Sequence, residues 1–144
     1  MASPPVRHIL GDGAASLLAI DFQKKGLSML DSLCVFCKII QGSIPSVVVK
    51  ENEYVTVIKN IAPKAPVHYL IIPKKHLSDV AALTESDQQF GWQMLKIAAD
   101  ISKEQNLSGF NLVANNGHSA GQSVFHLHFH FIAGKNLYSG GFTL

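Results

Sequence analysis

From Phe125 to Phe131, apolar residues alternate strictly with histidines. Successive side chains of a β-strand point to opposite faces, so this period of two predicts a strand. One face would carry His126, His128 and His130. The other face would carry the apolar set that suits a core against a helix: Phe125, Leu127, Phe129 and Phe131. Packing does not readily explain three histidines on one face, and the row indicates either a metal site or a site of nucleophilic catalysis.

The remaining apolar patterns predict an α+β fold. Four more strands are expected at residues 47–49, 54–58, 68–72 and 110–114, and the histidine strand should extend over 124–132. Thr84 to Asp87 resembles a capping box, and apolar residues at helical spacing follow it to about Leu107, with Gly109 just beyond. Because the connections are short, we expect a five-stranded, mostly antiparallel sheet with one long helix and a short N-terminal helix.

Residues 1–28 differ from the rest of the chain. They begin irregularly with Ser3-Pro4-Pro5, and the apolar run at residues 14–20 is compatible with a short helix. This run is too short, and too little basic charge precedes it, for a secretory signal. Met29 is a candidate alternative start. We therefore treat residues 1–28 as an N-terminal extension, disordered or foreign to the natural chain, and residues 29–144 as the folded domain.

Composition excludes several classes of protein. A chain of 144 residues suits one domain with a core large enough to fold alone. Apolar residues make up 47% and charged residues only 15%, against about 25% in an average protein, and a disordered chain would need the opposite balance, so disorder is excluded. A net charge of +2 argues against a nucleic-acid partner. No apolar run reaches the roughly 18 residues of a membrane span, so we expect no membrane partner and a cytoplasmic location.

The low charge is concentrated in one segment. Residues 105–134 contain no Asp, Glu, Lys or Arg, and the single arginine of the chain is Arg7. A polar loop with two glycines, residues 115–123, precedes the histidine strand. Such a loop is often an ordinary turn, but glycines let the backbone approach a ligand and free amides bind anions. Beside a row of imidazoles, the loop predicts a phosphate pocket.

The two cysteines stand as Cys34-x-x-Cys37, the spacing of a zinc knuckle or a redox pair. Two cysteines are too few for a disulfide scaffold. Two thiolates need two further ligands to close a structural zinc site. Two buried or free thiols in a reducing cytosol are the alternative.

The histidine strand and the three residues before it, Gly121-Gln122-Ser123, resemble the signature of the histidine triad family. The resemblance extends upstream to three segments: Phe36-x-Lys38-Ile39-Ile40 with Ile44-Pro45, Ala65-Pro66-x-His68, and Ile72-Pro73-Lys74-x-His76. It covers roughly residues 33–134. Ser123 and the ending Ala133-Gly134 resemble the Hint-like branch, the purine nucleoside phosphoramidases.

This resemblance implies a hydrolase that cleaves purine nucleoside phosphoramidates or aminoacyl-adenylates to AMP through a covalent nucleotidyl-histidine intermediate. His128 would be the nucleophile, since a neutral imidazole attacks near pH 7 without a metal. His130 and His68 would contact the phosphate or hold the polar network around it, and Ser123 would bind phosphate or assist the leaving group. Because the segment has no acid, we expect a backbone carbonyl to hold the other N–H of His128.

The resemblance also implies a nucleotide-binding set. Its apolar members would form the base pocket, with core packing as the alternative for each: Phe36, Ile39, Ile58 and Leu70. Its polar members would surround ribose and phosphate: Asn60, Asn115, Gly121, Gln122, Ser123, His128 and His130. Asn60 departs from the family pattern, because many Hint-like proteins carry an aspartate there. An amide lacks the charge assistance of a carboxylate, which weakens the expected ribose contact.

The resemblance further implies a structural zinc site completed by His76 and His126, with Cys34 and Cys37. It also implies a homodimer built on the long helix and the strand at 110–114. Trp92, which lies off the main apolar stripe of that helix, agrees with such an interface. Three other functions stay open: a nucleotide-binding or scaffold protein with weak activity, a dinucleoside polyphosphate hydrolase, and a metal-dependent hydrolase that uses all three histidines as ligands.

Overall fold

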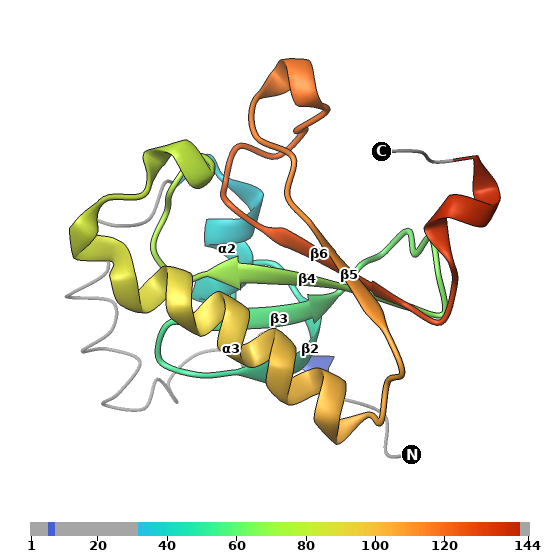
Figure 1. The fold of residues 1–144 in the computed structure, drawn as a ribbon. Helices are drawn as coiled ribbons and strands as arrows, with labels where there is room; N and C mark the ends of the chain where they lie inside the picture. Colours follow the sequence, from blue (N-terminus) through green and yellow to red (C-terminus); the bar gives the residue numbers. More distant parts are fainter. Residues whose placement is uncertain (1–5, 8–31, 142–144) are drawn as a thin grey trace.

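The computed structural model describes residues 6–7 and 32–141 and contains one antiparallel sheet with two α-helices (Figure 1). The elements in chain order are β1 Val6–Arg7, α2 Val35–Gln41, β2 Ser46–Glu51, β3 Val55–Lys59, β4 Val67–Pro73, α3 Gln88–Glu104, β5 Phe110–Val113 and β6 Phe129–Ala133. Short 3₁₀ turns occur at Val80–Ala82, Glu85–Asp87, His118–Ala120 and Leu137–Gly140. In the described residues, no helix has the length and apolar character that a membrane span requires.

The strand order is β1-β2-β3-β4-β6-β5, with every neighbouring pair antiparallel. The predicted α+β class is therefore confirmed, with β2 to β6 as its five strands, α3 as the long helix and α2 as the short one. The sixth strand, β1, lies within residues 1–28 and pairs with β2. The short helix expected at residues 14–20, and Met29, lie outside the described residues.

Each face of the sheet is covered by one helix (Figure 1). Val57 and Ile71 point toward α3 and pack in one buried cluster with its apolar stripe: Met94, Ile97, Ala98 and Ile101. Ile58 follows Val57 on β3, and Leu70 precedes Ile71 on β4. Both therefore point to the opposite face, toward α2, and pack against Phe36. The period of two along β3 and β4 thus separates a large core under α3 from a smaller core under α2.

The predicted capping box closes a 3₁₀ turn at Glu85–Asp87, helix α3 follows directly from Gln88, and it ends earlier than predicted. The capping box is confirmed: the Thr84 N–H donates to Asp87 Oδ2 at 2.9 Å, and the Asp87 backbone N–H donates back to Thr84. The helix ends at Glu104 because Asn106 is left-handed, with φ 52°. The N–H of Leu107 then bonds to the carbonyl of Ser102 at 2.9 Å, as in a Schellman motif. Asn106 therefore serves where Gly109 was expected.

The predicted strand from Val124 to Ile132 is wrong in its first half, since β6 begins at Phe129. In the register with β4, Ile71 lies opposite Phe129, so a longer strand would meet Pro73. Proline has no N–H for a ladder. Its carbonyl accepts instead from the ring of His126 at 2.9 Å. Residues 124–128 consequently run as irregular chain, and Phe125, expected in the core, is 50% exposed.

Candidate functional site

The histidines gather where β4 and β6 lie side by side. His68 belongs to β4 and His130 to β6, and His130 lies opposite Leu70 in the register. His128 stands just before β6, at the side of the sheet that α2 covers, with its ring centroid 5.0 Å from that of Phe36. The structure therefore brings together three of the four predicted catalytic residues.

The orientation of His128 follows from one hydrogen bond. Its Nδ1 lies 2.7 Å from the backbone carbonyl of His126, and because a carbonyl can only accept, Nδ1 carries the proton. The expectation that a backbone carbonyl holds this ring is confirmed. Nε2 of the neutral ring then keeps its lone pair. Burial lowers the pKa of His128, so the ring is neutral at pH 7 and Nε2 is available as a nucleophile.

His68 and His130 are joined by a second chain of hydrogen bonds. The backbone N–H of Lys64 donates to His68 Nδ1 at 3.0 Å, so the proton of the neutral ring is on Nε2. That Nε2–H donates to His130 Nδ1 at 2.9 Å and leaves His130 with its own proton on Nε2. His130 therefore offers a hydrogen-bond donor, next to the His128 ring at 5.2 Å between centroids.

The charge state of this pair is set by burial. Burial, together with the charges of His128 and His68, lowers the pKa of His130 to about 4. Burial and the positive charge of Lys64 lower the pKa of His68. Near pH 7 the site is therefore a group of neutral imidazoles with assigned donors and acceptors.

Asn60 contacts one member of this pair, His68. Its Oδ1 accepts from the backbone N–H of Ala62 at 2.9 Å, and its Nδ2 lies 3.2 Å from His68 Nε2. Both Ala62 N–H and His68 Nε2–H are donors. Whichever way the amide of Asn60 is turned, one of its hydrogens faces another hydrogen.

In the loop over residues 115–123, two side-chain amides bind backbone groups. Gln122 is buried; its Oε1 accepts from the Gly117 N–H at 2.8 Å, and its Nε2 donates to the carbonyls of Ser78 at 2.7 Å and Val124 at 3.0 Å. Asn115 Nδ2 donates to the Ala120 carbonyl at 2.8 Å. These contacts fix the shape of the loop.

Gly121 and Ser123 lie at the turn that these amides hold. Gly121 has a left-handed backbone with φ 86°, which favours glycine. Ser123 is exposed and stands five residues before His128 in the chain. The loop thus presents a hydroxyl near the start of the histidine segment. The nucleotide contacts assigned to these residues stay predictions.

The four apolar residues assigned to a base pocket are all buried in the core cluster under α2: Phe36, Ile39, Ile58 and Leu70. Phe36 differs from the other three because its ring also packs edge-on against His126 and His128. The set therefore lies beside the histidines and also serves as core. Their position is consistent with both interpretations from the sequence, a base pocket and core packing.

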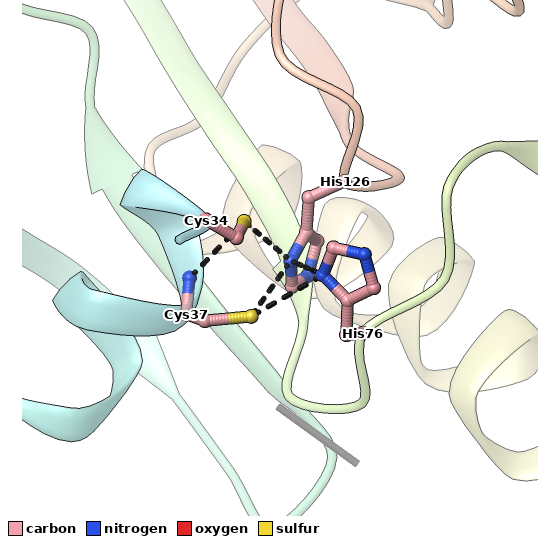
Figure 2. A group of neighbouring side chains, drawn as sticks. All are labelled: Cys34, Cys37, His76 and His126. Carbon is pink, nitrogen blue, oxygen red and sulfur yellow. Dashed lines mark hydrogen bonds between the residues drawn. The ribbon is translucent and has the colours of Figure 1, made fainter. Parts of the chain in front are cut away.

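Cys34, Cys37, His76 and His126 form a second group next to the first (Figure 2). Cys34 caps the start of α2 and Cys37 lies within that helix, His76 lies in the loop after β4, and His126 precedes β6. Their ligand atoms all lie within 4.8 Å of one another, close enough to hold a metal ion. This is the set that the family resemblance implied.

Four of the six distances between ligand atoms in this group fit a tetrahedral ion. Cys37 Sγ lies 3.3 Å from His76 Nδ1 and 3.5 Å from His126 Nδ1, and Cys34 Sγ lies 3.4 Å from His126 Nδ1. The two Nδ1 atoms are 3.2 Å apart. Tetrahedral zinc with ordinary bond lengths gives N···S edges of about 3.5 Å and an N···N edge of about 3.3 Å.

The tautomer of His126 is also the one a ligand needs. Its Nε2–H donates to the Pro73 carbonyl at 2.9 Å, so Nδ1 has a lone pair directed at the cysteines. Burial lowers the pKa of His126 to about 4. The His126 ring faces the two cysteines and His76, whereas His128 and His130 belong to the first group. The described residues therefore do not form a site in which all three histidines bind one metal.

Several partners in both groups could not be found by motif. The Pro73 and His126 carbonyls and the Lys64 N–H are backbone groups, and each fixes one imidazole tautomer. No side-chain pattern in the sequence signals them. They are brought to the rings by the pairing of β4 with β6 and by the loop before β4.

Comparison with known proteins supports the family resemblance. A family model described as "Scavenger mRNA decapping enzyme C-term binding" matches residues 33–141. Protein hit of Bacillus subtilis is 45% identical over 100 residues, which are 69% of this chain and 69% of that protein. An uncharacterised HIT-like protein of Synechocystis is 39% identical over 102 residues, 70% of this chain and 90% of that protein.

Solved structures agree with these relatives. A HIT family hydrolase from Clostridium thermocellum superposes with a TM-score of 0.71 and 42% identity, covering 74% of this chain and 95% of that one. A histidine triad protein from Clostridium difficile gives a TM-score of 0.72 and 36% identity, covering 76% of this chain and 96% of that one.

Proposed function

Because the chain belongs to the histidine triad family and resembles hydrolases of that family, we propose that it is a Hint-like enzyme that releases AMP from purine nucleoside phosphoramidates or aminoacyl-adenylates. One observation carries the proposal most strongly. His128 is held through Nδ1–H by the His126 carbonyl, which leaves a neutral Nε2 beside the donor Nε2–H of His130. This is a nucleophile next to a group that can bind a phosphate oxygen.

The proposed reaction has two steps at the α-phosphorus. In the first, His128 Nε2 forms a bond to phosphorus and the bond from phosphorus to the leaving group breaks. A leaving amine takes a proton from solvent through the Ser123 hydroxyl, whereas the carboxylate that leaves an aminoacyl-adenylate needs none. In the second, water adds to phosphorus, the bond to His128 breaks, and the proton lost by the water returns to solvent. His130 Nε2–H stabilises the negative oxygens in both steps, with its Nδ1 oriented by His68.

Turnover by the full chain tests this reaction. We expect wild-type protein to release AMP from adenosine 5′-phosphoramidate, and His128→Ala to lower kcat by about a thousandfold or more while AMP still binds. His128→Gly with added free imidazole should recover part of the rate, because the imidazole replaces the missing ring. Equal turnover by His128→Ala and wild type would rule out the assignment.

We further propose that the cysteine and histidine group binds zinc and not another metal. Two thiolates and two imidazoles at tetrahedral distances are a ligand set typical of structural zinc. Thiolate ligands persist in a reducing compartment, so we place the protein in the cytoplasm. Elemental analysis of protein made without added metal is expected to give one zinc per chain. Protein without zinc, with both thiols titrating freely, would contradict the site.

We also propose a homodimer. Trp92 is 57% exposed and Leu95 50% exposed on α3, and Phe110 is 38% exposed on the edge strand β5. Large apolar side chains exposed on a helix and a neighbouring strand edge are typical of an interface.

A further inference from the structure

His126 connects the two groups of the site. Its ring Nδ1 is directed at the two cysteines and His76 (Figure 2). Its backbone carbonyl accepts the Nδ1–H of His128 at 2.7 Å. The same residue therefore contributes a side chain to the metal group and a main-chain acceptor to the nucleophile.

The direction of that carbonyl depends on how residue 126 is anchored. Residues 124–128 precede β6 and have no ladder of their own. Their backbone is tied by the Leu127 N–H to the Leu77 carbonyl at 2.6 Å and by the Val124 carbonyl to Gln122. The His126 ring supplies further anchors, through Pro73 at Nε2 and through the metal group at Nδ1.

Helix α2 gives a second connection. Phe36 lies between the two cysteines in sequence, and its ring contacts both His126 and His128, with centroids 5.9 Å and 5.0 Å away. Cys34 and Cys37 would share a bound metal ion with His126, and this would fix α2 against residue 126. Phe36 would then also be fixed against the nucleophile.

From this geometry we infer that the metal group positions the nucleophile, with His126 as the positioning residue. Cys34, Cys37, His76 and His126 would hold a metal ion together, and the His126 ring, anchored in this way, would keep its own backbone carbonyl against His128 Nδ1–H. This keeps His128 in the tautomer whose Nε2 is free. The inference rests on the proposed role of His128 and adds a reason why the metal group lies next to it.

Nitrogen-15 NMR of the imidazole rings tests this directly in the full chain, because it reports the tautomer of His128 without turnover. Zinc-loaded protein should show His128 as a single Nδ1–H tautomer. His76→Ala, which removes a ligand that does not touch His128, should show a mixture of tautomers. Its kcat should fall by about ten- to a hundredfold, with KM changed by no more than about twofold. His76→Cys restores four ligands and should restore both readouts.

Two further variants separate positioning from general loss of stability. Asn106→Ala strains the left-handed backbone after α3, touches neither group of the site, and should lower Tm while leaving the His128 tautomer unchanged. His126→Cys keeps a metal ligand but brings the main chain closer to the ion. It should still bind cobalt with a tetrahedral spectrum, while the His128 tautomer becomes mixed.

The outcomes distinguish this inference from the proposed function. If His128 keeps one Nδ1–H tautomer in His76→Ala, the inference is wrong. If His76→Ala does not fold, the same result in metal-bound His126→Cys makes the inference wrong. If the tautomer follows the metal but no variant or wild type releases AMP, positioning stands and the proposed reaction fails.

Discussion

At the scale of single residues, Asn60 is the least well matched group of the site. It sits between two donors, the Ala62 N–H and the Nε2–H of His68, and has one acceptor to offer. A carboxylate has two oxygens, so one could accept from Ala62 and the other could share the Nε2–H that His68 donates to His130. The departure noted in the sequence therefore affects the histidine network as well as the expected ribose contact.

Asn60→Asp should increase the free energy of unfolding by about 1 kcal/mol at pH 7.5, because the amide hydrogen held against His68 Nε2 is removed and the carboxylate can share the Nε2–H that His68 donates to His130. Urea unfolding measures this. Asn136→Asp is the matched control, since Asn136 is exposed and its Oδ1 already accepts from the Tyr138 N–H. A gain at Asn60 no larger than the gain at Asn136 would contradict the assigned tautomer of His68.

The lowered pKa of His130 makes stability depend on pH. In the folded chain the pKa is about 4, against an ordinary value of 6.5. Between these values the unfolded chain binds more protons, so the free energy of unfolding should fall as the pH drops from about 6.5 toward 4. His130 is half-buried, so solvent reduces the size of the effect.

Urea unfolding of wild type and His130→Gln across pH 7.5 to 4.5 checks this, with glutamine chosen because its oxygen can still accept from His68. The metal ligands and the other histidines are common to both proteins. The difference in unfolding free energy between the two should therefore shift in favour of the variant below about pH 6. Parallel pH curves would contradict the assignment.

At the scale of the elements, much of the fold follows from local patterns. The strands near residues 47–49, 54–58 and 68–72, the strand at 110–114 and the start of α3 were all predictable, because alternation and the Thr84 capping box act locally. The end of α3 and the start of β6 were not. Asn106 takes the left-handed backbone that was expected of a glycine, and the start of β6 depends on Pro73, which lies on β4.

Asn106→Gly should leave Tm unchanged or slightly raised, whereas Asn106→Ala should cost about 1 kcal/mol, because alanine tolerates a left-handed backbone poorly. Thermal unfolding followed by circular dichroism gives both values. Lys103→Ala, at an exposed position in the last turn of α3, is the control and should change stability by less than about 0.5 kcal/mol. Equal effects of alanine at 103 and 106 would count against the Schellman end.

At the scale of the whole molecule, the site is made by the meeting of distant segments. The motif itself predicted which residues belong to it, and the pairing of β4 with β6 places His68 near His130. A backbone carbonyl was expected to hold His128, but which backbone groups set each tautomer could not be predicted from the motif. Sequence alternation predicted one row of three histidines. The chain before β6 is irregular, however, and directs His126 to the cysteines instead.

The proposed dimer is tested at this scale. Trp92→Glu places a charge in the exposed apolar patch of α3 and should convert the protein to a monomer in sedimentation velocity at micromolar concentration. Val80→Glu, an exposed apolar site in the loop before α3, should leave the dimer intact. Wild-type protein that sediments as a monomer at every concentration would end the dimer proposal.

The central claim is that His128 becomes covalently bonded to the nucleotide. Rapid quench of the full chain with adenosine 5′-phosphoramidate into alkaline denaturant, which preserves the acid-labile phosphorus–nitrogen bond, followed by intact and peptide mass spectrometry, tests it most directly. We expect a transient species heavier by AMP less one water, with the added mass on His128, and no such species for His128→Ala. Steady release of AMP without any adduct, or an adduct on another residue, would contradict the account.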